Sequence, residues 1–384
     1  MKLKIKRIVL IFLLLLIMLV PTVRATSDTY EYTIKGTRDY KKAYEIAEMI
    51  NTERRKRGLS EYSIDYHLMD CAMYRAAEIA VHYDSNHLRP NEEIWYSLLD
   101  TTRFFSGGEN IAAHQSSTQE VMNAWMNSPG HKANILDEKG YGFNTMGIGV
   151  FKSELGLYYW VQWFGGTESP KADHVYSNMQ INEVVEVKYG VLPFWDVNEN
   201  DYFYNALCYN VANKYILGYN SNVFGPSYEM TRGMVVTVLY RMEGTPYPDG
   251  DKILSDINGD EYYAKAVKWA VNNGVVNGYA DGTFKPNKNV TRQELIVILR
   301  NYLRYKQGAN AVKVKDDGTF EKFADINNVD DYAKSAVMWA VENTVIRGRN
   351  SNGKIYIDPQ GVSIRADVAC MFYNYAKAYF PDNV

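Results

Sequence analysis

The sequence predicts an α+β domain followed by an all-α module of three helical repeats. Upstream of about Phe164, stretches with helical spacing precede two aromatic and β-branched runs, Met146 to Phe151 and Leu157 to Phe164, which predict a β-hairpin. Downstream, one order of motifs occurs three times, and each copy is typical of two short helices joined by a turn. A chain of 384 residues is also too long for one ordinary core.

Residues 1–25 have the pattern of a signal peptide. Lys2 to Arg7 is basic, Ile8 to Val20 is an unbroken apolar run, and Val23-Arg24-Ala25 offers small residues where a signal peptidase cleaves. The run is short for a membrane span, which needs about 20 apolar residues. We therefore expect an exported protein, cleaved near Ala25 and without a membrane span afterwards; the alternative is an uncleaved N-terminal anchor.

Charge and cysteine content narrow the class of protein. Without the five basic residues of segment 1–25, 37 basic residues remain against 45 acidic ones, a net charge of −8. Such a chain has no bulk positive field to attract phosphates, so we expect no nucleic-acid partner. The odd set of Cys71, Cys208 and Cys370 predicts no disulfide framework.

Three helices are expected in the upstream domain. One has its apolar face at Ala43 to Ile50 and a second at Leu68 to Ala80. Ser117-Thr118-Gln119-Glu120 is typical of a capping box and predicts a third helix that reaches Trp125. Residues 167–192 are expected to connect the two parts; the Ile181 to Val187 stretch has strand character, but its place is left open.

The repeats share an acidic opening, a glycine-containing turn and a second helix start. The first copy has Phe194-Trp195-Asp196-Val197, Leu217-Gly218-Tyr219, Phe224-Gly225-Pro226 and Thr231-Arg232-Gly233; the second has Ser255-Asp256-Ile257, Asn277-Gly278-Tyr279, Phe284-Lys285-Pro286 and Thr291-Arg292-Gln293; the third has Phe323-Ala324-Asp325-Ile326, Gly348, Asp358-Pro359 and Ile364-Arg365-Ala366, with about four inserted residues. Two short helices cannot bury their apolar faces alone, so the copies should pack against one another.

These motifs resemble the S-layer homology (SLH) family, with repeats at 193–245, 252–305 and 322–377. The resemblance implies an all-α module of helical hairpins. It also implies non-covalent binding to an anionic secondary cell-wall polysaccharide attached to peptidoglycan. The expected location is therefore the bacterial cell wall or S-layer surface.

The helix starts suggest which residues bind that polymer. Thr291 and Glu294 are placed to form a capping box, which puts Arg292 in the first helical turn, and Arg232 and Arg365 have the corresponding places. Because the helix dipole disfavours a cation there, three such arginines favour an anionic partner. The predicted polysaccharide site comprises these arginines and the opening aspartates, Asp196, Asp256 and Asp325. The alternative is that each arginine pairs with an acid in its own repeat.

The upstream domain has four motifs in order: Asn86 to Pro90, Gly107 to Ala112, Ala124 to Leu136 and Tyr158 to Gln162. They resemble the bacterial form of the CAP (SCP-like) superfamily, over residues 39–166, and imply an α-β-α sandwich. The resemblance places His87, Glu109 and His131 in a central cleft. The second family acid falls near Ser128, so this chain lacks it.

Two functions follow for the CAP domain. In the first, the surface-anchored chain displays it for an unassigned ligand, needs no cofactor and is not an enzyme. In the alternative, it is a metal-dependent envelope hydrolase. His87, Glu109 and His131 are then the catalytic candidates, and the two histidines hold a divalent metal such as zinc, since two imidazoles and a carboxylate can ligate zinc or move protons.

Overall fold

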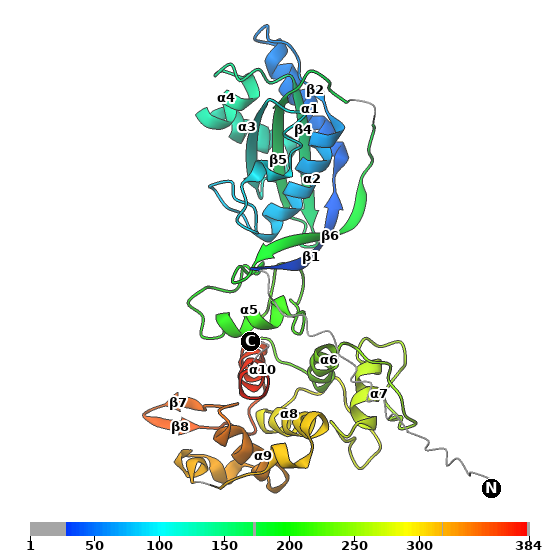
Figure 1. The fold of residues 1–384 in the computed structure, drawn as a ribbon, viewed down its shortest axis with the longest axis vertical. Coiled ribbons are helices and arrows are strands. Elements are labelled where there is room, and N and C mark those ends of the chain that lie inside the picture. Colours follow the sequence, from blue (N-terminus) through cyan, green and yellow to red (C-terminus); the bar gives the residue numbers. More distant parts are fainter. Residues whose placement is uncertain (1–27, 172–173, 317, 382–384) are drawn as a thin grey trace, which may run out of the picture.

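The computed structural model describes residues 28–171, 174–316 and 318–381. The predicted signal peptide, residues 1–25, lies outside them. Figure 1 shows two parts stacked along the longest axis, with a sheet and helices α1 to α4 in the upper part and helices α5 to α10 in the lower part. No helix within the described ranges is long and apolar enough to cross a membrane.

The upper part is built on one sheet with the strand order β3-β5-β4-β1-β6, and β2 pairs with β4. All its pairings are antiparallel except the parallel β2–β4 pair. The hairpin predicted from two aromatic runs is confirmed as β4 and β5. The strands are β1 (Thr29–Arg38), β2 (Ser63–Ile64), β3 (Ser106–Ala113), β4 (Thr145–Ser153), β5 (Tyr158–Gly166) and β6 (Met179–Lys188).

Helices cover both faces of this sheet, as expected for an α-β-α sandwich. Helix α2 (Tyr66–Val81) lies on one face, and α1 (Tyr40–Arg55), α3 (Thr118–Asn127) and α4 (Pro129–Leu136) lie on the other (Figure 1). Gly147 and Gly149 of β4 let α2 approach closely, because a Cβ on Gly149 would lie 1.8 Å from the carbonyl oxygen of Ala72.

Helix α3 begins where predicted, but its capping box is incomplete. Ser117 caps the helix by accepting the backbone N–H of Glu120 at 3.2 Å. The Glu120 carboxylate accepts the backbone N–H of Ser116 at 2.9 Å, one residue before the expected partner.

The sheet extends beyond the predicted domain bounds of 39–166. Strand β1 precedes them, and β6 lies within the 167–192 segment that was expected to be a connector. The two strands pair along all ten of their residues. Tyr30, Tyr32 and Ile34 alternate with exposed residues, so β1 has a period-two signal that the sequence analysis missed.

The lower part contains the three predicted helical hairpins: α5 (Tyr204–Ala212) with α6 (Arg232–Met242), α7 (Ala264–Asn272) with α8 (Arg292–Gln307), and α9 (Asp331–Glu342) with α10 (Arg365–Tyr379). The extra residues of the third repeat form a small hairpin of β7 (Arg349–Ser351) and β8 (Lys354–Tyr356). Four short 3₁₀ turns complete the described elements: η1 (Trp95–Leu98), η2 (Ala309–Val312), η3 (Thr319–Lys322) and η4 (Ile326–Asn328).

The three repeats close into a ring. The backbone N–H of Val290 donates to Met230, that of Ser363 donates to Val290, and that of Met230 donates to Ser363, each at 2.9 Å. Helix α6 packs on α7, α8 on α9, and α10 on α5, so every repeat contacts both others. The prediction that the copies pack against one another is confirmed.

The two parts of the chain share an apolar cluster and a set of hydrogen bonds. The Tyr32 hydroxyl donates to the carbonyl of Ser221 at 2.6 Å, and the buried Asn222 amide donates to the carbonyl of Ala80 at 2.8 Å. A buried amide with its donor satisfied holds its neighbours in a fixed arrangement. The first repeat is therefore attached directly to β1 and to the end of α2.

Candidate functional site

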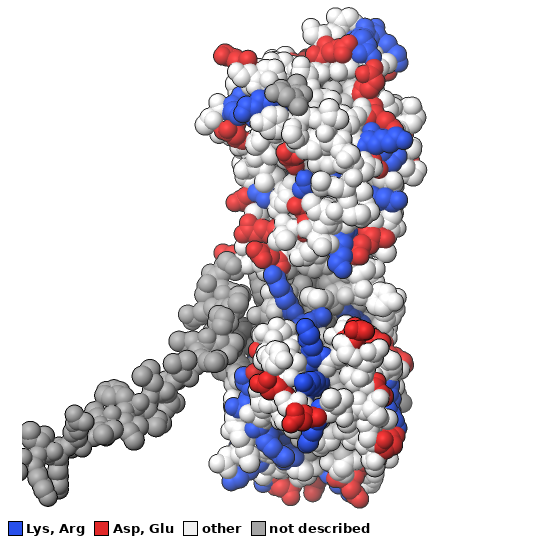
Figure 2. Space-filling model, turned by 90° about the vertical axis from the view of Figure 1, so that its right-hand side faces the viewer, with Lys and Arg blue, Asp and Glu red and all other residues white. Residues whose placement is uncertain are grey.

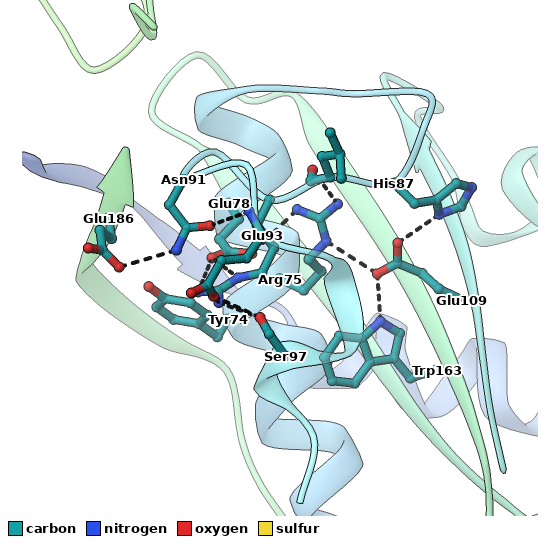
Figure 3. Close-up of polar contacts among 12 residues, drawn as sticks. Tyr74, Arg75, Glu78, His87, Asn91, Glu93, Ser97, Glu109, Trp163 and Glu186 are labelled. Carbon is teal, nitrogen blue, oxygen red and sulfur yellow. Dashed lines mark hydrogen bonds and ion pairs between the residues drawn. The ribbon is translucent and has the colours of Figure 1, made fainter. Parts of the chain in front are cut away.

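Glu109 is the centre of the polar cluster in the upper domain. Its Oε1 lies 2.7 Å from Nδ1 of His87, and its Oε2 accepts Nε1–H of Trp163 at 2.7 Å and Nε–H of Arg75 at 3.2 Å (Figure 3). The carboxylate is buried, whereas the His87 side chain is 30% exposed. The predicted neighbourhood of His87 and Glu109 is thus confirmed, and Glu109 holds the imidazole in place.

Buried ion pairs of helix α2 hold Arg75 in place next to Glu109. Arg75 and Glu78 are fully buried on α2, 3.3 Å apart, and Glu78 also accepts Arg89 at 2.8 Å. Burial raises the pKa of Glu78, while the guanidinium groups of Arg89 and Arg75 oppose that rise. Arg75, Glu78 and Trp163 were not predicted as site residues. For the first two, the available signal was a charged pair three residues apart in the alanine-rich second half of α2.

His131 approaches from the opposite face of the sheet. On edge strand β3, Glu109 faces α2 while Asn110 faces α4, where its amide donates to the His131 carbonyl at 3.0 Å. Burial, and then the neighbouring His87, lower the pKa of His131, so its imidazole is neutral at pH 7. The two predicted histidines are therefore electrostatic neighbours, although no hydrogen bond between them is present.

His131 lines a cleft of about 680 Å³, whereas His87 and Glu109, expected in the same cleft, are not among the described residues that line it. Its walls are the end of α2, the end of β3, parts of α3 and α4, and residues 192–195 from the opening of the first repeat. His82 and His114, which match no motif, also line it. Ser128, at the position where the second family acid was expected, also lines the cleft.

These residues fit a metal poorly. Within the described ranges, no group of three or more His, Cys, Asp or Glu is arranged to hold a metal ion. Glu109 is committed to Arg75, Trp163 and His87, which leaves two imidazoles, whereas catalytic zinc sites use three protein ligands. The zinc alternative and the hydrolase built on it gain no support from this donor set.

We expect the purified full-length protein to carry substoichiometric zinc, and His131→Ala to leave that content unchanged. Elemental analysis by mass spectrometry after dialysis against zinc checks this, with Lys132→Ala as the neighbouring control. Stoichiometric zinc that disappears in His87→Ala or His131→Ala would contradict it.

In the lower module, the three predicted arginines are more than nine-tenths buried and join neighbouring repeats. Each occupies the first position of its helix, and its Nε–H donates to a carbonyl of the next repeat around the ring: Arg232 to Phe284 at 3.0 Å, Arg292 to Ile357 at 2.9 Å, and Arg365 to Phe224 at 2.7 Å. The idea that only an external anion stabilises a cation at these helix starts is therefore wrong. The carbonyls of the ring already do so.

The three opening aspartates bind backbone N–H groups, although Asp196 is exposed and the other two are half-buried. Both carboxylate oxygens of each one accept backbone N–H groups of the same repeat at 2.7 to 2.8 Å: Asp196 from Phe224 and Gly225, Asp256 from Phe284 and Lys285, and Asp325 from Ile357 and Asp358. Each aspartate thereby fixes the loop whose carbonyl accepts the arginine of the preceding repeat around the ring. The alternative pairing of each arginine with the aspartate of its own repeat is absent from the ion pairs of the described residues.

Two of the arginines still border grooves between repeats. Arg292 lines a groove of about 960 Å³ with Arg347, Arg349, Lys377 and Asp367. Arg232 lines a smaller one of about 310 Å³, with Glu294 in the place of Asp367.

Charge in the larger groove is unevenly compensated. Burial alone would raise the pKa of Asp367, but a hydrogen bond from Tyr202 and the guanidinium groups of Arg349 and Arg292 lower it. Arg347 is exposed and has no ion pair within the described part of the chain. The lining of the groove thus has four cationic side chains and one acid, and Asp358, outside the lining, forms a second ion pair with Arg349.

Two family models match the chain. The model described as the cysteine-rich secretory protein family, CAP, matches residues 47–164, and the S-layer homology domain matches residues 254–296. The chain contains a CAP domain and an SLH domain. The SLH match covers the second repeat, whose Thr291–Glu294 capping box is complete in the structure.

Two curated relatives are each similar to about a third of this chain. The Surface-layer 125 kDa protein of Lysinibacillus sphaericus is 34% identical over 124 residues, which cover 32% of this chain and 10% of the relative. Uncharacterized protein YkwD of Bacillus subtilis is 34% identical over 131 residues, 32% of this chain and 48% of the relative. This chain therefore spans half or less of these relatives.

Two solved structures are similar to about a third of this chain. An extracellular protein containing an SCP domain from Bacillus anthracis is 24% identical at a TM-score of 0.30, over 34% of this chain and 41% of that one. An outer surface protein from Borrelia burgdorferi is also 24% identical at a TM-score of 0.30, over 35% of this chain and 99% of that one.

Proposed function

We propose that this protein resides at the bacterial cell surface, where its SLH module binds an anionic secondary cell-wall polysaccharide and so displays the CAP domain. The observation that carries the proposal is the groove at Arg292, where four cations face one acid. The SLH match and the relatedness to a surface-layer protein support the location. A relative named cellulosome-anchoring protein, from Acetivibrio thermocellus, is 27% identical over 93 residues, 23% of this chain and 21% of the relative.

The surface charge of the module supports an anionic ligand although the chain as a whole is acidic. On the face seen in Figure 2, lysine and arginine side chains gather in a column over the lower part, whereas the two signs of charge are interspersed over the upper part. A concentrated positive surface attracts a polyanion more strongly than net charge suggests.

Within the groove, Arg347 and Lys377 are the most direct candidates for ligand contact. Both side chains are exposed and neither has an ion pair among the described residues. Arg292 and Arg349 are already paired with Asp367. Tyr202 is 69% exposed at the rim, and its hydroxyl donates to Asp367 at 2.7 Å, so its ring offers a face for a sugar.

We expect the double variant Arg347→Ala with Lys377→Ala to bind purified cell walls roughly tenfold more weakly or worse, because a hydrogen bond to a charged group contributes about 1.5–3 kcal/mol. Cosedimentation of the full chain with walls measures this, and added salt should weaken the wild-type interaction.

The matched control is Lys252→Ala with Lys322→Ala, which removes the same charge from exposed positions outside both grooves. Equal wall binding by the two double variants would refute the groove assignment. A wild-type protein that does not pellet with walls would refute the anchoring function.

A further inference from the structure

The CAP cleft is completed by the first SLH repeat. Residues 192–195 form one of its walls, and Trp195 lies against His114 with ring centroids 5.8 Å apart. The Trp195 backbone N–H donates to Asn222 at 3.0 Å, and the Asn222 side chain bonds to both Pro193 and Ala80. The wall is thus fixed to the CAP domain rather than resting loosely beside it.

Lining chemistry narrows the ligand. Lysine, arginine, aspartate and glutamate are absent from the described residues that line the cleft. A charged ligand that moved from water into this cleft would find no opposite charge there, and burying an unpaired charge costs free energy. The cleft therefore favours a ligand without formal charge.

Two aromatic rings are available at this cleft. Trp195 is 47% exposed and Tyr83 is 46% exposed, so both present ring surface to an incoming molecule. Trp and Tyr combine an apolar face with a polar edge, which suits a ligand that is itself apolar on its faces and polar at its rim. A pyranose ring has this character, with C–H groups on its faces and hydroxyl groups around its edge.

The polar side chains around the rings are uncommitted. Within the described structure, no hydrogen bond engages the side chains of His82, His114, Ser128 or His131. The imidazoles and the hydroxyl can donate to and accept from sugar hydroxyls.

From this geometry we infer that the cleft binds a neutral oligosaccharide, with one sugar stacked on Trp195. The inference goes beyond wall anchoring and does not depend on it, since the SLH groove is lined by charge and this cleft is not. It makes the bound saccharide a ligand of both domains, because Trp195 and His131 come from different ones. The binding site is then lost when the domains are separated.

Isothermal titration of the full chain with chitotetraose, a neutral N-acetylglucosamine oligomer, tests the inference. We expect saturable binding by the wild type and a loss of roughly tenfold in affinity in Trp195→Ala, because aromatic contact is removed. Trp195→Phe should recover most of the affinity. Tyr247→Ala, at an exposed tyrosine outside the cleft, should bind like the wild type.

The two proposals can fail separately. Trp195→Ala should still pellet with cell walls, which also shows that it is folded, and the Arg347→Ala with Lys377→Ala variant should still bind chitotetraose. A wild type that ignores chitotetraose, or a Trp195→Ala variant that binds it equally well, would overturn the inference. Binding of neutral phospholipid vesicles in place of the saccharide, lost in Trp195→Ala, would overturn it in favour of a lipid ligand.

Discussion

Replacing Glu109 by alanine is expected to destabilise the CAP domain by roughly 3–5 kcal/mol, because one partner of a buried charge network is removed. The Glu109 carboxylate satisfies Nε–H of Arg75, Nε1–H of Trp163 and Nδ1 of His87 at once. Without it, Arg75 retains a 3.0 Å hydrogen bond to the Leu88 carbonyl and a 3.3 Å ion pair with Glu78, and Glu78 is shared with Arg89. Urea unfolding followed by tryptophan fluorescence measures the loss, since Trp163 reports on this core directly.

Two further variants separate charge from shape at this position. Glu109→Gln keeps the volume and one acceptor for Trp163 but not the charge, so it should fall between wild type and Glu109→Ala. The control is Glu93→Ala, whose half-exposed carboxylate pairs with Arg89 at 2.6 Å and should contribute at most about 1 kcal/mol. If Glu109→Ala is no less stable than Glu93→Ala, Glu109 does not hold the network together.

The sequence predicted one contact of Glu109 but not the others. Family resemblance placed Glu109 beside His87, and the structure confirms that pair. The residues that decide its chemistry are Arg75, 34 positions upstream, and Trp163, 54 positions downstream. No motif indicates that either residue contacts Glu109. The sequence therefore predicted Glu109 as a site residue, but not that its carboxylate is held by Arg75 and Trp163.

The repeats were predictable because their signal is local. Motif order alone defined three helical hairpins, and the Thr291 capping box is present as expected. The orientation of the arginine side chains depends instead on ring closure, which joins Arg365 to residues 141 and 148 positions away. In the same way β1 and β6 pair at a separation of about 150 residues, so the alternation in each was visible but their partnership was not.

Ring closure depends most on Arg365, which joins the third repeat to the first. Its Nε–H donates to Phe224 at 2.7 Å, a second guanidinium N–H donates to Leu217 at 2.5 Å, and the guanidinium lies 4.6 Å from the Phe224 ring centre. Burial lowers its pKa to about 10, with Asp196 partly opposing and Arg241 adding to that effect. Arg365 has no ion pair within the described structure, in contrast to Arg292, so carbonyl groups are its main partners.

Arg365→Ala is therefore expected to destabilise the SLH module by roughly 2–4 kcal/mol, because the buried carbonyl of Phe224 and the half-buried carbonyl of Leu217 each lose a donor and a cavity remains. Arg365→Met keeps most of the side-chain volume but makes no hydrogen bonds. Its loss of stability relative to the wild type therefore measures the hydrogen bonds, and the further loss in Arg365→Ala measures the cavity. Arg347→Ala, an exposed arginine in the same repeat, serves as the control and should change stability little.

Thermal unfolding and limited proteolysis of the full chain check the effects of both Arg365 variants. Proteolysis should begin between the first and third repeats if Arg365 closes the ring, whereas an unchanged melting temperature in Arg365→Ala would show that the backbone bonds among Met230, Val290 and Ser363 suffice without it.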